Sequence, residues 1–378
     1  MITSLVLVVC FIACHGGPAD HFSTFSKELE KKGYKVQIYA SGPALKKFQE
    51  REVENLIPFS LDNISEVEAA VRLARKCSEA AVVITDVGDA FDISLQKALS
   101  VEAPQALRFA YYDNPEPYVP GGYSAIAAKV MVAADRVLFA NANLAKSSVY
   151  QAPSQLIELP PDKRVGIGYY PISQAEKIAK RRAADPDGLR MDFFSKYRLF
   201  DRGQKVLVYA GGNNDEFFSK AFPAFLQFLA TLIQKKDFSD FVVLLQRHPG
   251  AKGKNIDGKL VQSWISQYGQ SVYAPKILIS DFNSDDAQVL ADGMLYYQTS
   301  MGPQFVLAGI PTIQVGHECY ADILVKNNLC SVANGADELL DALVRLQKSM
   351  KMEQYDVIRQ GLGMAEDWVE RLEQVLIR

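Results

Sequence analysis

The 378-residue chain lacks most of the features that mark specialised classes of protein. Its five cysteines are odd in number and scattered, which suits neither a disulfide framework nor a zinc site and favours free thiols in a reducing compartment. The 41 basic and 44 acidic residues leave no excess of positive charge, which argues against non-specific nucleic-acid binding. No apolar run reaches the roughly 18 residues that span a bilayer, so no transmembrane segment is expected. These absences predict a cytoplasmic protein.

The chain also lacks the two best-known nucleotide-binding motifs. Neither G-x-G-x-x-G nor a Walker A sequence occurs, which argues against a dinucleotide cofactor and against an NTPase. No clustered carboxylate pair of the kind that holds Mg²⁺ is visible, so we expect no metal and no cofactor. The chain contains 48% hydrophobic and 22% charged residues, which is the ordinary balance of a globular protein with a sizeable core. At roughly 150 residues per domain, the length predicts two domains.

The opening stretch LVLVVCFIAC, Leu5–Cys14, resembles both a signal and a buried strand. A secretory signal needs a positively charged start, and this segment contains no lysine or arginine. A glycine turn follows at Gly16–Gly17, then a helical spacing over Phe22–Leu29 and an alternating strand over Tyr34–Tyr39. Strand, turn, helix and strand in this order form a βαβ unit, whose first strand is continuously apolar when a parallel sheet is covered on both faces. We therefore interpret the segment as the first buried strand.

Apolar runs and helical stretches alternate through the rest of the chain. Runs at Ala81–Thr85, Leu107–Ala110 and Arg136–Ala140 belong to one series, and a second series begins at Lys205–Ala210 after a segment rich in proline, glycine and charge. The pattern predicts an α/β fold with two Rossmann-like domains, each built on a doubly wound parallel sheet. The predicted boundaries are 1–165 for the N-terminal domain, 166–203 for the connection, 204–350 for the C-terminal domain and 351–378 for a C-terminal helix.

All four histidines lie in or just past a loop at the carboxyl end of a predicted strand. They are His15, His21, His248 and His317. In open α/β sheets ligands bind in the crevice beyond the carboxyl ends of the strands. Because histidine titrates near neutral pH, it can serve there as a base or as a phosphate partner. We therefore expect at least two of the four to line a ligand site.

Glycines and small polar residues occupy the same kind of position. Gly16–Gly17 and Gly211–Gly212 each follow the first strand of a predicted domain, where glycine lets the backbone approach a ligand closely. Thr299, Ser300 and Gly302 precede a predicted helix, whose N-terminal amides suit a diphosphate. These segments predict an anion site in each domain.

Two segments resemble glycosyltransferases of the GT-B architecture. The segment GGPADHFSTFSKELEKKGYKV, Gly16–Val36, resembles the family's N-terminal GG…H…L…L…GHEV pattern, with His21 on the motif's histidine. The segment SMGPQFVLAGIPTIQV, Ser300–Val315, resembles the family's nucleotide-sugar-binding helix, with Gln304 where a glutamate commonly grips the ribose. The resemblance implies two Rossmann-like domains facing each other across a cleft.

The resemblance also implies a reaction and the residues that carry it. The N-terminal domain would bind an unidentified acceptor, and the C-terminal domain would hold a nucleoside-diphosphate sugar, with UDP as the expected nucleotide. The expected base is His21, and the alternatives are His15, Asp86 and Asp113. The residues expected to bind the nucleotide sugar are Gly17, Gly212, Asn213, Arg247, His248, Ser300, Met301, Gly302, Gln304 and His317. Helix N-termini and cationic side chains would stabilise the leaving diphosphate without a metal.

Two alternatives stay open from the sequence. UDP-N-acetylglucosamine 2-epimerases share the fold, and the RHPG stretch at Arg247–Gly250 is similar to their His-Pro turn. Such an enzyme would bind a UDP-sugar in the same cleft but would need no acceptor. The other alternative is a non-enzymatic, exported sugar-binding lipoprotein that is processed and anchored at Cys14.

Overall fold

The structure is a computed structural model that describes residues 6–116, 123–146, 149–151, 156–184, 187–236, 241–248, 251, 253, 255–297, 299, 301–346 and 353–377. The chain divides into two compact units. Unit 1 comprises Met1–Tyr170 together with Arg359–Arg378, and unit 2 comprises Pro171–Ile358. The sequence-based domain boundaries stay predictions. Among the described residues, none of the helices combines the length and the apolar character needed to cross a membrane.

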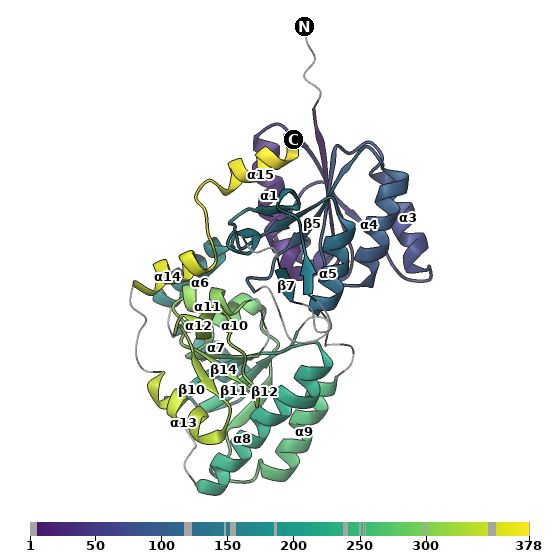
Figure 1. The fold of residues 1–378 in the computed structure, drawn as a ribbon. Helices are drawn as coiled ribbons and strands as arrows, with labels where there is room; N and C mark the ends of the chain where they lie inside the picture. Colours follow the sequence, from purple (N-terminus) through teal and green to yellow (C-terminus); the bar gives the residue numbers. More distant parts are fainter. Residues whose placement is uncertain are drawn as a thin grey trace. The chain divides into compact units, whose positions relative to one another are not determined.

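Unit 1, with β5, α1 and α15 labelled in Figure 1, contains a seven-stranded parallel sheet in the order β3-β2-β1-β4-β5-β6-β9. The strands are β1 Val8–Ala13, β2 Lys35–Ala40, β3 Leu56–Pro58, β4 Val82–Thr85, β5 Leu107–Tyr112, β6 Arg136–Phe139 and β9 Arg164–Gly166. The prediction that the opening segment is a buried strand is confirmed: β1 pairs with both β2 and β4, and Val9–Ala13 are completely buried.

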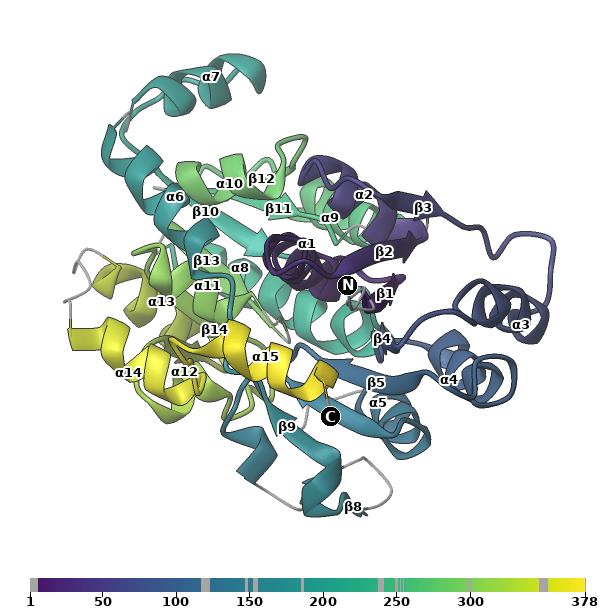
Figure 2. The same ribbon diagram turned by 90° about the horizontal axis from the view of Figure 1, so that it is seen from above.

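Helices cover both faces of this sheet. They are α1 Gly16–Lys31, α2 Gly42–Glu50, α3 Glu66–Lys76, α4 Ala90–Glu102, α5 Tyr123–Ala133 and α15 Trp368–Ile377. Figure 2 shows α1 and α15 on one side of the strands and α3, α4 and α5 on the other. Phe11 and Phe109 face the first group, whereas Cys10 and Ile12 face α3 and α4. This alternation within an entirely apolar strand is what a sheet covered on both faces requires.

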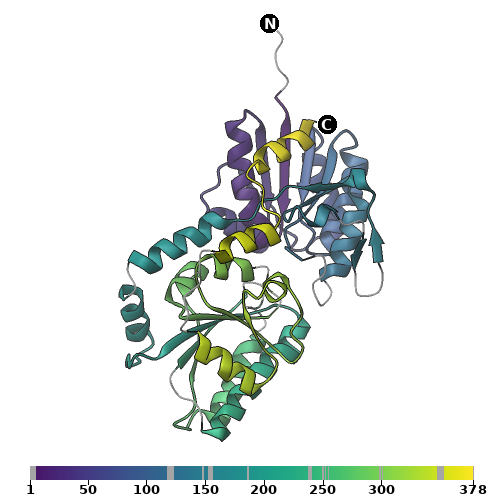
Figure 3. The same ribbon diagram turned by 60° about the vertical axis from the view of Figure 1, so that its left-hand side comes forward.

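The C-terminal helix α15 lies on the α1 face of the sheet, as Figure 3 also shows. Trp368 lies 4.6 Å from Tyr169 and 5.4 Å from Phe25 between ring centroids. Leu372 is completely buried, and Lys32, the C-cap residue of α1, donates to Glu373 at 2.9 Å. Full burial of a leucine contributes about 1.5–3 kcal/mol, so α15 is part of the core of unit 1. Its short predecessor, α14, spans Glu353–Gly361.

Unit 2 contains a six-stranded parallel sheet in the order β12-β11-β10-β13-β14-β15. The strands are β10 Lys205–Ala210, β11 Phe241–Gln246, β12 Lys276–Ile279, β13 Gly293–Tyr296, β14 Thr312–Val315 and β15 Ser331–Ala333. The longer helices are α6 Ile172–Ala184, α7 Gly188–Lys196, α8 Phe222–Lys235, α9 Ile256–Tyr268 and α13 Ala336–Arg345. The shorter ones are α10 Ser284–Leu290, α11 Gly302–Leu307 and α12 Ile323–Lys326, and a π-helical turn over Phe217–Ala221 precedes α8. Helices α8, α9 and α13 pack on one face.

Candidate functional site

Two neighbouring strands of unit 1 bring predicted site residues together. Strands β1 and β4 run parallel with Ile12 opposite Thr85, so the residues that follow them meet at the carboxyl edge of the sheet. His15 ends the turn after β1 as the N-cap of α1, and Asp86 directly follows β4. The backbone N–H of Asp86 donates to the Ile12 carbonyl at 3.2 Å, which extends the sheet by one residue.

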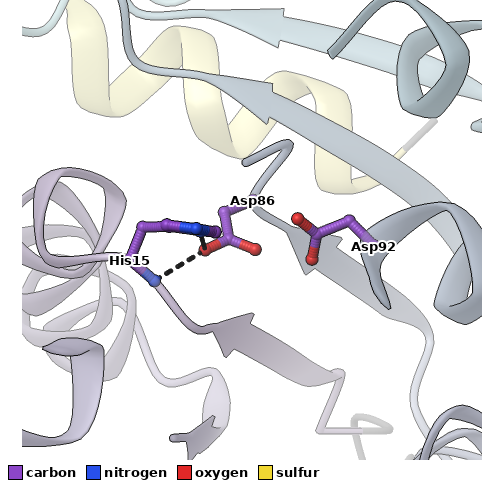
Figure 4. Close-up of side chains that lie close together, drawn as sticks. All are labelled: His15, Asp86 and Asp92. Atoms are coloured by element: carbon purple, nitrogen blue, oxygen red, sulfur yellow. Dashed lines mark hydrogen bonds and ion pairs between the residues drawn. The ribbon is translucent and has the colours of Figure 1, made fainter. Parts of the chain in front are cut away.

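The His15 imidazole and the Asp86 carboxylate form a hydrogen-bonded pair (Figure 4). His15 Nδ1 lies 2.9 Å from Asp86 Oδ2. The same oxygen accepts the backbone N–H groups of Cys14 at 2.9 Å and His15 at 3.0 Å. Asp86 is completely buried, while the His15 side chain is 37% exposed. A buried carboxylate thus orients a ring that solvent can reach, which is the arrangement of a base and its orienting group.

The charges around His15 favour its protonated form. Burial would lower the pKa of His15, but the hydrogen bond to Asp86 and the charges of Asp86, Asp89 and Asp113 together raise it to about 9. Asp89 Oδ2 lies 3.8 Å from His15 Nε2. Burial would raise the pKa of Asp86, but the hydrogen bond and charge of His15 outweigh it and leave that pKa below its usual value.

Asp113, which follows β5, lies at the start of α1 beside this pair. A Cβ atom added at Gly17 would overlap the Asp113 carboxylate, so glycine is needed there to let Asp113 approach the helix. Tyr123 donates to Asp113 Oδ1 at 3.4 Å. Burial, followed by the charge of Asp86, raises the pKa of Asp113 to about 6, although the charge of His15 opposes this. The sequence-predicted residues His15, Gly17, Asp86 and Asp113 are therefore gathered at one edge.

His21 lies elsewhere, inside α1 on the buried face of the helix. Its Nδ1 atom shares a 2.6 Å hydrogen bond with the Tyr111 hydroxyl. The edges of Tyr169 and Tyr170 surround the ring at centroid distances of 5.3 and 6.1 Å. Burial lowers the pKa of His21 to about 4, and the charge of Asp20 offsets only part of this effect. The ring is therefore neutral and belongs to an aromatic cluster of the unit 1 core.

Three further residues belong to the edge site but were not predicted from the sequence. Asp89 caps α4 and Asp92 completes its capping box. Their spacing is the usual signal of a helix start, which gives no hint of a site. A Cβ atom at Gly88 would overlap the His15 ring, so glycine makes room for the imidazole. Asp92 is completely buried, and no sequence pattern distinguishes it from an exposed acidic residue.

The spacing of this cluster also suits a cation. His15, Asp86 and Asp92 each offer one ligand atom, and these atoms lie within 4.8 Å of one another. However, the Asp86 oxygen nearest His15 already accepts three N–H donors. Three donors leave this oxygen no free lone pair, so a cation would have to bind Asp86 through Oδ1, which has no hydrogen-bond partner among the described residues.

In unit 2, predicted residues follow four adjacent strands. Gly211 and Gly212 follow β10, and each has a packing reason for lacking a side chain. A Cβ atom at Gly211 would lie 3.1 Å from the Gln246 carbonyl, and one at Gly212 would lie 2.7 Å from the Phe217 ring. Asn213 is exposed at the end of this turn. The Gly-Gly pair therefore allows close packing of loops at the carboxyl edge.

The two predicted cationic residues after β11 differ in their surroundings. Arg247 donates through Nε and Nη2 to the buried carboxylate of Asp257, at 2.8 and 2.6 Å. This pairing neutralises the guanidinium at the first turn of α9. His248 is exposed beside it, and its role in binding the donor stays a prediction.

The remaining predicted residues lie around α11 and after β14. Met301 caps α11 and donates its backbone N–H to Thr299 Oγ1 at 3.2 Å. Gly302 and Gln304 are buried in the first turn of α11. His317 is exposed after β14, with its ring 5.5 Å from Phe228. Ser300 lies outside the described residues.

No family model matches the sequence, and none of the curated proteins compared with it is similar. The fold, however, is similar to solved structures along nearly the whole chain. UDP-GlcNAc 2-epimerase from Methanocaldococcus jannaschii, in complex with UDP-GlcNAc and UDP, has a TM-score of 0.68 at 11% identity and covers 98% of this chain and 99% of that one. The Neisseria meningitidis UDP-GlcNAc 2-epimerase, bound to UDP-GlcNAc, has a TM-score of 0.66 at 12% identity, with 98% and 100% covered.

A glycosyltransferase from Rickettsia africae is also similar, with a TM-score of 0.62 at 11% identity over 99% of this chain and 98% of that one. At identities this low, the likeness establishes the fold and not the activity. The seven-stranded and six-stranded parallel sheets are consistent with this fold. The chain thus has the GT-B-like fold that the sequence resemblance predicted.

Proposed function

We propose that this protein transfers a sugar from a nucleoside-diphosphate sugar to an acceptor hydroxyl, with His15 as the base. The observation that carries the proposal is the His15–Asp86 pair, a partly exposed imidazole oriented by a buried carboxylate at the carboxyl edge of the unit 1 sheet. Ligands of open α/β folds bind at such edges. The observed surroundings favour His15 over His21, because His21 is buried and hydrogen-bonded to Tyr111.

The reaction would proceed as a direct displacement. The acceptor oxygen forms a bond to the anomeric carbon of the donor sugar, and the bond from that carbon to the diphosphate oxygen breaks. The acceptor proton moves to Nε2 of a neutral His15, while Nδ1–H keeps its hydrogen bond to Asp86. Asp86 stabilises the imidazolium that forms, which is how a buried carboxylate assists a histidine base.

The donor would bind to unit 2. Its predicted contacts are the amides of Gly212 and Asn213 for the diphosphate, and Gln304 for the ribose. Met301, Gly302, His248 and His317 complete the predicted set. Arg247 contributes mainly by fixing the start of α9, because Asp257 already pairs with its charge.

The epimerase alternative has support from the solved structures, since two of the similar proteins are UDP-GlcNAc 2-epimerases. The lipoprotein alternative has a structural difficulty. Processing at Cys14 would remove β1, which pairs with β2 and β4 in the middle region of the sheet. The two activities that remain to be distinguished are therefore sugar transfer and epimerisation.

One experiment separates these two activities and tests the base. The full chain is incubated with UDP-GlcNAc and other nucleoside-diphosphate sugars, with and without a panel of hydroxyl acceptors, and the products are followed by NMR. Transfer predicts that a glycoside and free nucleoside diphosphate appear together and depend on an acceptor. Epimerisation predicts an inverted sugar C2 without an acceptor.

The matched variants are His15→Gln and His21→Gln. Loss of a general base typically costs about 10²–10⁴-fold in rate, so the His15 variant should lose turnover by that factor. The His21 variant should lose stability but keep turnover wherever it remains folded. Unchanged turnover in a folded His15 variant would refute the assignment.

A further inference from the structure

Two buried carboxyl groups face each other beneath His15. Figure 4 shows the Asp86 and Asp92 side chains pointing toward one another, Asp86 from the end of β4 and Asp92 from the first turn of α4. Both residues are completely buried. An oxygen of one carboxyl lies within 4.8 Å of an oxygen of the other. Neither has an arginine or lysine partner among the described residues.

Two of the four oxygens of these carboxyls lack a hydrogen-bond donor among the described residues. Asp86 Oδ2 accepts three N–H groups, and Asp92 Oδ2 accepts the backbone N–H of Asp89 at 3.0 Å. The other oxygens, Asp86 Oδ1 and Asp92 Oδ1, have no hydrogen-bond partner among the described residues. Two carboxyls buried with oxygens within 4.8 Å of each other cannot both keep a negative charge, because the like charges and the burial disfavour ionisation of one of them.

We propose that Asp92 is permanently protonated and donates its O–H to Asp86 Oδ1. Asp92 is then a positioning residue: it holds Asp86 in place while Asp86 orients His15. The donor set of Asp86 is complete in this arrangement, with N–H groups on one oxygen and the Asp92 hydroxyl on the other. Its importance for turnover rests on the proposed function, whereas the protonation itself does not.

The electrostatic surroundings agree with this assignment. Burial, followed by the charge of Asp86, raises the pKa of Asp92 well above its usual value. His15 pairs with Asp86 from the turn after β1, and burial above all raises the pKa of the nearby Cys14 thiol, so this thiol stays neutral. Asp89 and Asp113 add further negative charge near His15. A negative charge on Asp92 would be opposed by the charges of Asp86 and Asp89, so the proton is retained there.

The test measures the pKa of the His15 imidazole by NMR in the full chain without substrate. The chain has only four histidines, so a His15→Gln spectrum assigns the resonance. Asp92→Asn is nearly isosteric: its carbonyl can accept the Asp89 N–H and its amide can donate to Asp86. If Asp92 is protonated, this variant removes no charge, and the pKa of His15 should change by less than about 0.3.

Asp89→Asn is the matched control, because asparagine also caps helices well. This change does remove a charge 3.8 Å from His15 Nε2. It should lower the pKa of His15 by about 0.5–1. A similar fall in Asp92→Asn would mean that Asp92 is ionised and would overturn the proposal.

Two measurements on the unmodified protein complete the test and need no variant to fold. The ¹³C shift of the Asp92 carboxyl should stay at its protonated value through neutral pH, and an ionised value would refute the proposal. Titration with Mn²⁺ should leave the His15 resonance sharp. Selective broadening at low Mn²⁺ would place a cation where we propose a proton. None of these outcomes depends on whether the protein transfers a sugar.

Discussion

At the scale of single residues, the site depends on one oxygen atom. Asp86 Oδ2 receives two backbone N–H groups and the His15 ring, so the backbone turn after β1 and the imidazole are fixed by the same carboxylate. A change at Asp86 therefore alters both the charge beside His15 and its orientation. The pH dependence of turnover should reveal the change in charge beside His15. The maximal rate should reveal the change in its orientation.

We predict that kcat/KM rises with pH through an ionisation near 9, because His15 must be neutral to accept a proton and its pKa is about 9. In Asp86→Asn the pKa of His15 should fall, since burial lowers it and the main opposing charge is gone. The ionisation then moves to lower pH, while the maximal rate drops by about 10²–10⁴-fold because the ring is misoriented. Rate measurements across the alkaline range check both effects. An unchanged ionisation in the variant would contradict the pairing.

A second residue-scale prediction concerns Gly88, where a Cβ atom would overlap the His15 ring. Gly88→Ala should push the imidazole away from Asp86 and lower its pKa from about 9 toward the ordinary value. Displacement of a catalytic group by about 1 Å can cost roughly 10²-fold in rate. Gly16→Ala is the control, because a Cβ there meets nothing within 4 Å. Equal behaviour of the two variants would show that the space at Gly88 is not needed for His15.

The same residues show what sequence can and cannot predict. His15, Asp86 and Asp113 are identifiable because each follows an apolar run, and the ends of parallel strands converge. Asp92 is not identifiable, because a charged residue in the first turn of a helix is normally exposed and serves the cap. For His21, the sequence predicts a place in the motif but not its burial. The face of α1 on which His21 lies depends on packing against Tyr111 and Tyr169.

At the scale of elements, strands were easier to predict than the helices around them. The central strands are continuous apolar runs, and the runs predicted at Ala81–Thr85, Arg136–Ala140 and Lys205–Ala210 match β4, β6 and β10 to within one residue. The segment predicted as a charged connection contains α6 and α7, because α6 buries only Gln174, Ala175 and Ile178 and so carries a weak apolar stripe. The short edge strands β3 and β15 have only three residues each, too few for a pattern to emerge.

The element-scale prediction concerns α15. Leu372→Ala should destabilise unit 1 by about 2–5 kcal/mol, because the leucine is completely buried against the sheet and the lost side chain leaves a cavity. Ile377 lies on the same helix but is 65% exposed, so Ile377→Ala should cost less than about 0.5 kcal/mol. Urea unfolding of the full chain, followed by a probe in unit 1, measures the difference. Equal small effects would mean that α15 is not part of the core.

At the scale of the whole molecule, the proposed function requires a nucleotide to bind the folded chain. A nucleoside diphosphate held at 100 times its Kd should stabilise the protein by about 2.7 kcal/mol. Thermal unfolding with UDP, GDP, ADP, CDP and dTDP measures this directly, and we expect UDP to give the largest increase in Tm. The absence of an effect from all five at millimolar concentration would argue against any donor of this class.

The way α15 completes unit 1 has a consequence for protein synthesis. The first segment of unit 1 is synthesised before unit 2, but the helix that covers Phe25 and Tyr169 is synthesised after unit 2. Unit 2, by contrast, is one continuous stretch of chain and can finish folding while translation still proceeds. The nascent chain can therefore complete unit 2 first, while one face of the unit 1 sheet keeps its aromatic side chains uncovered until α15 has been synthesised.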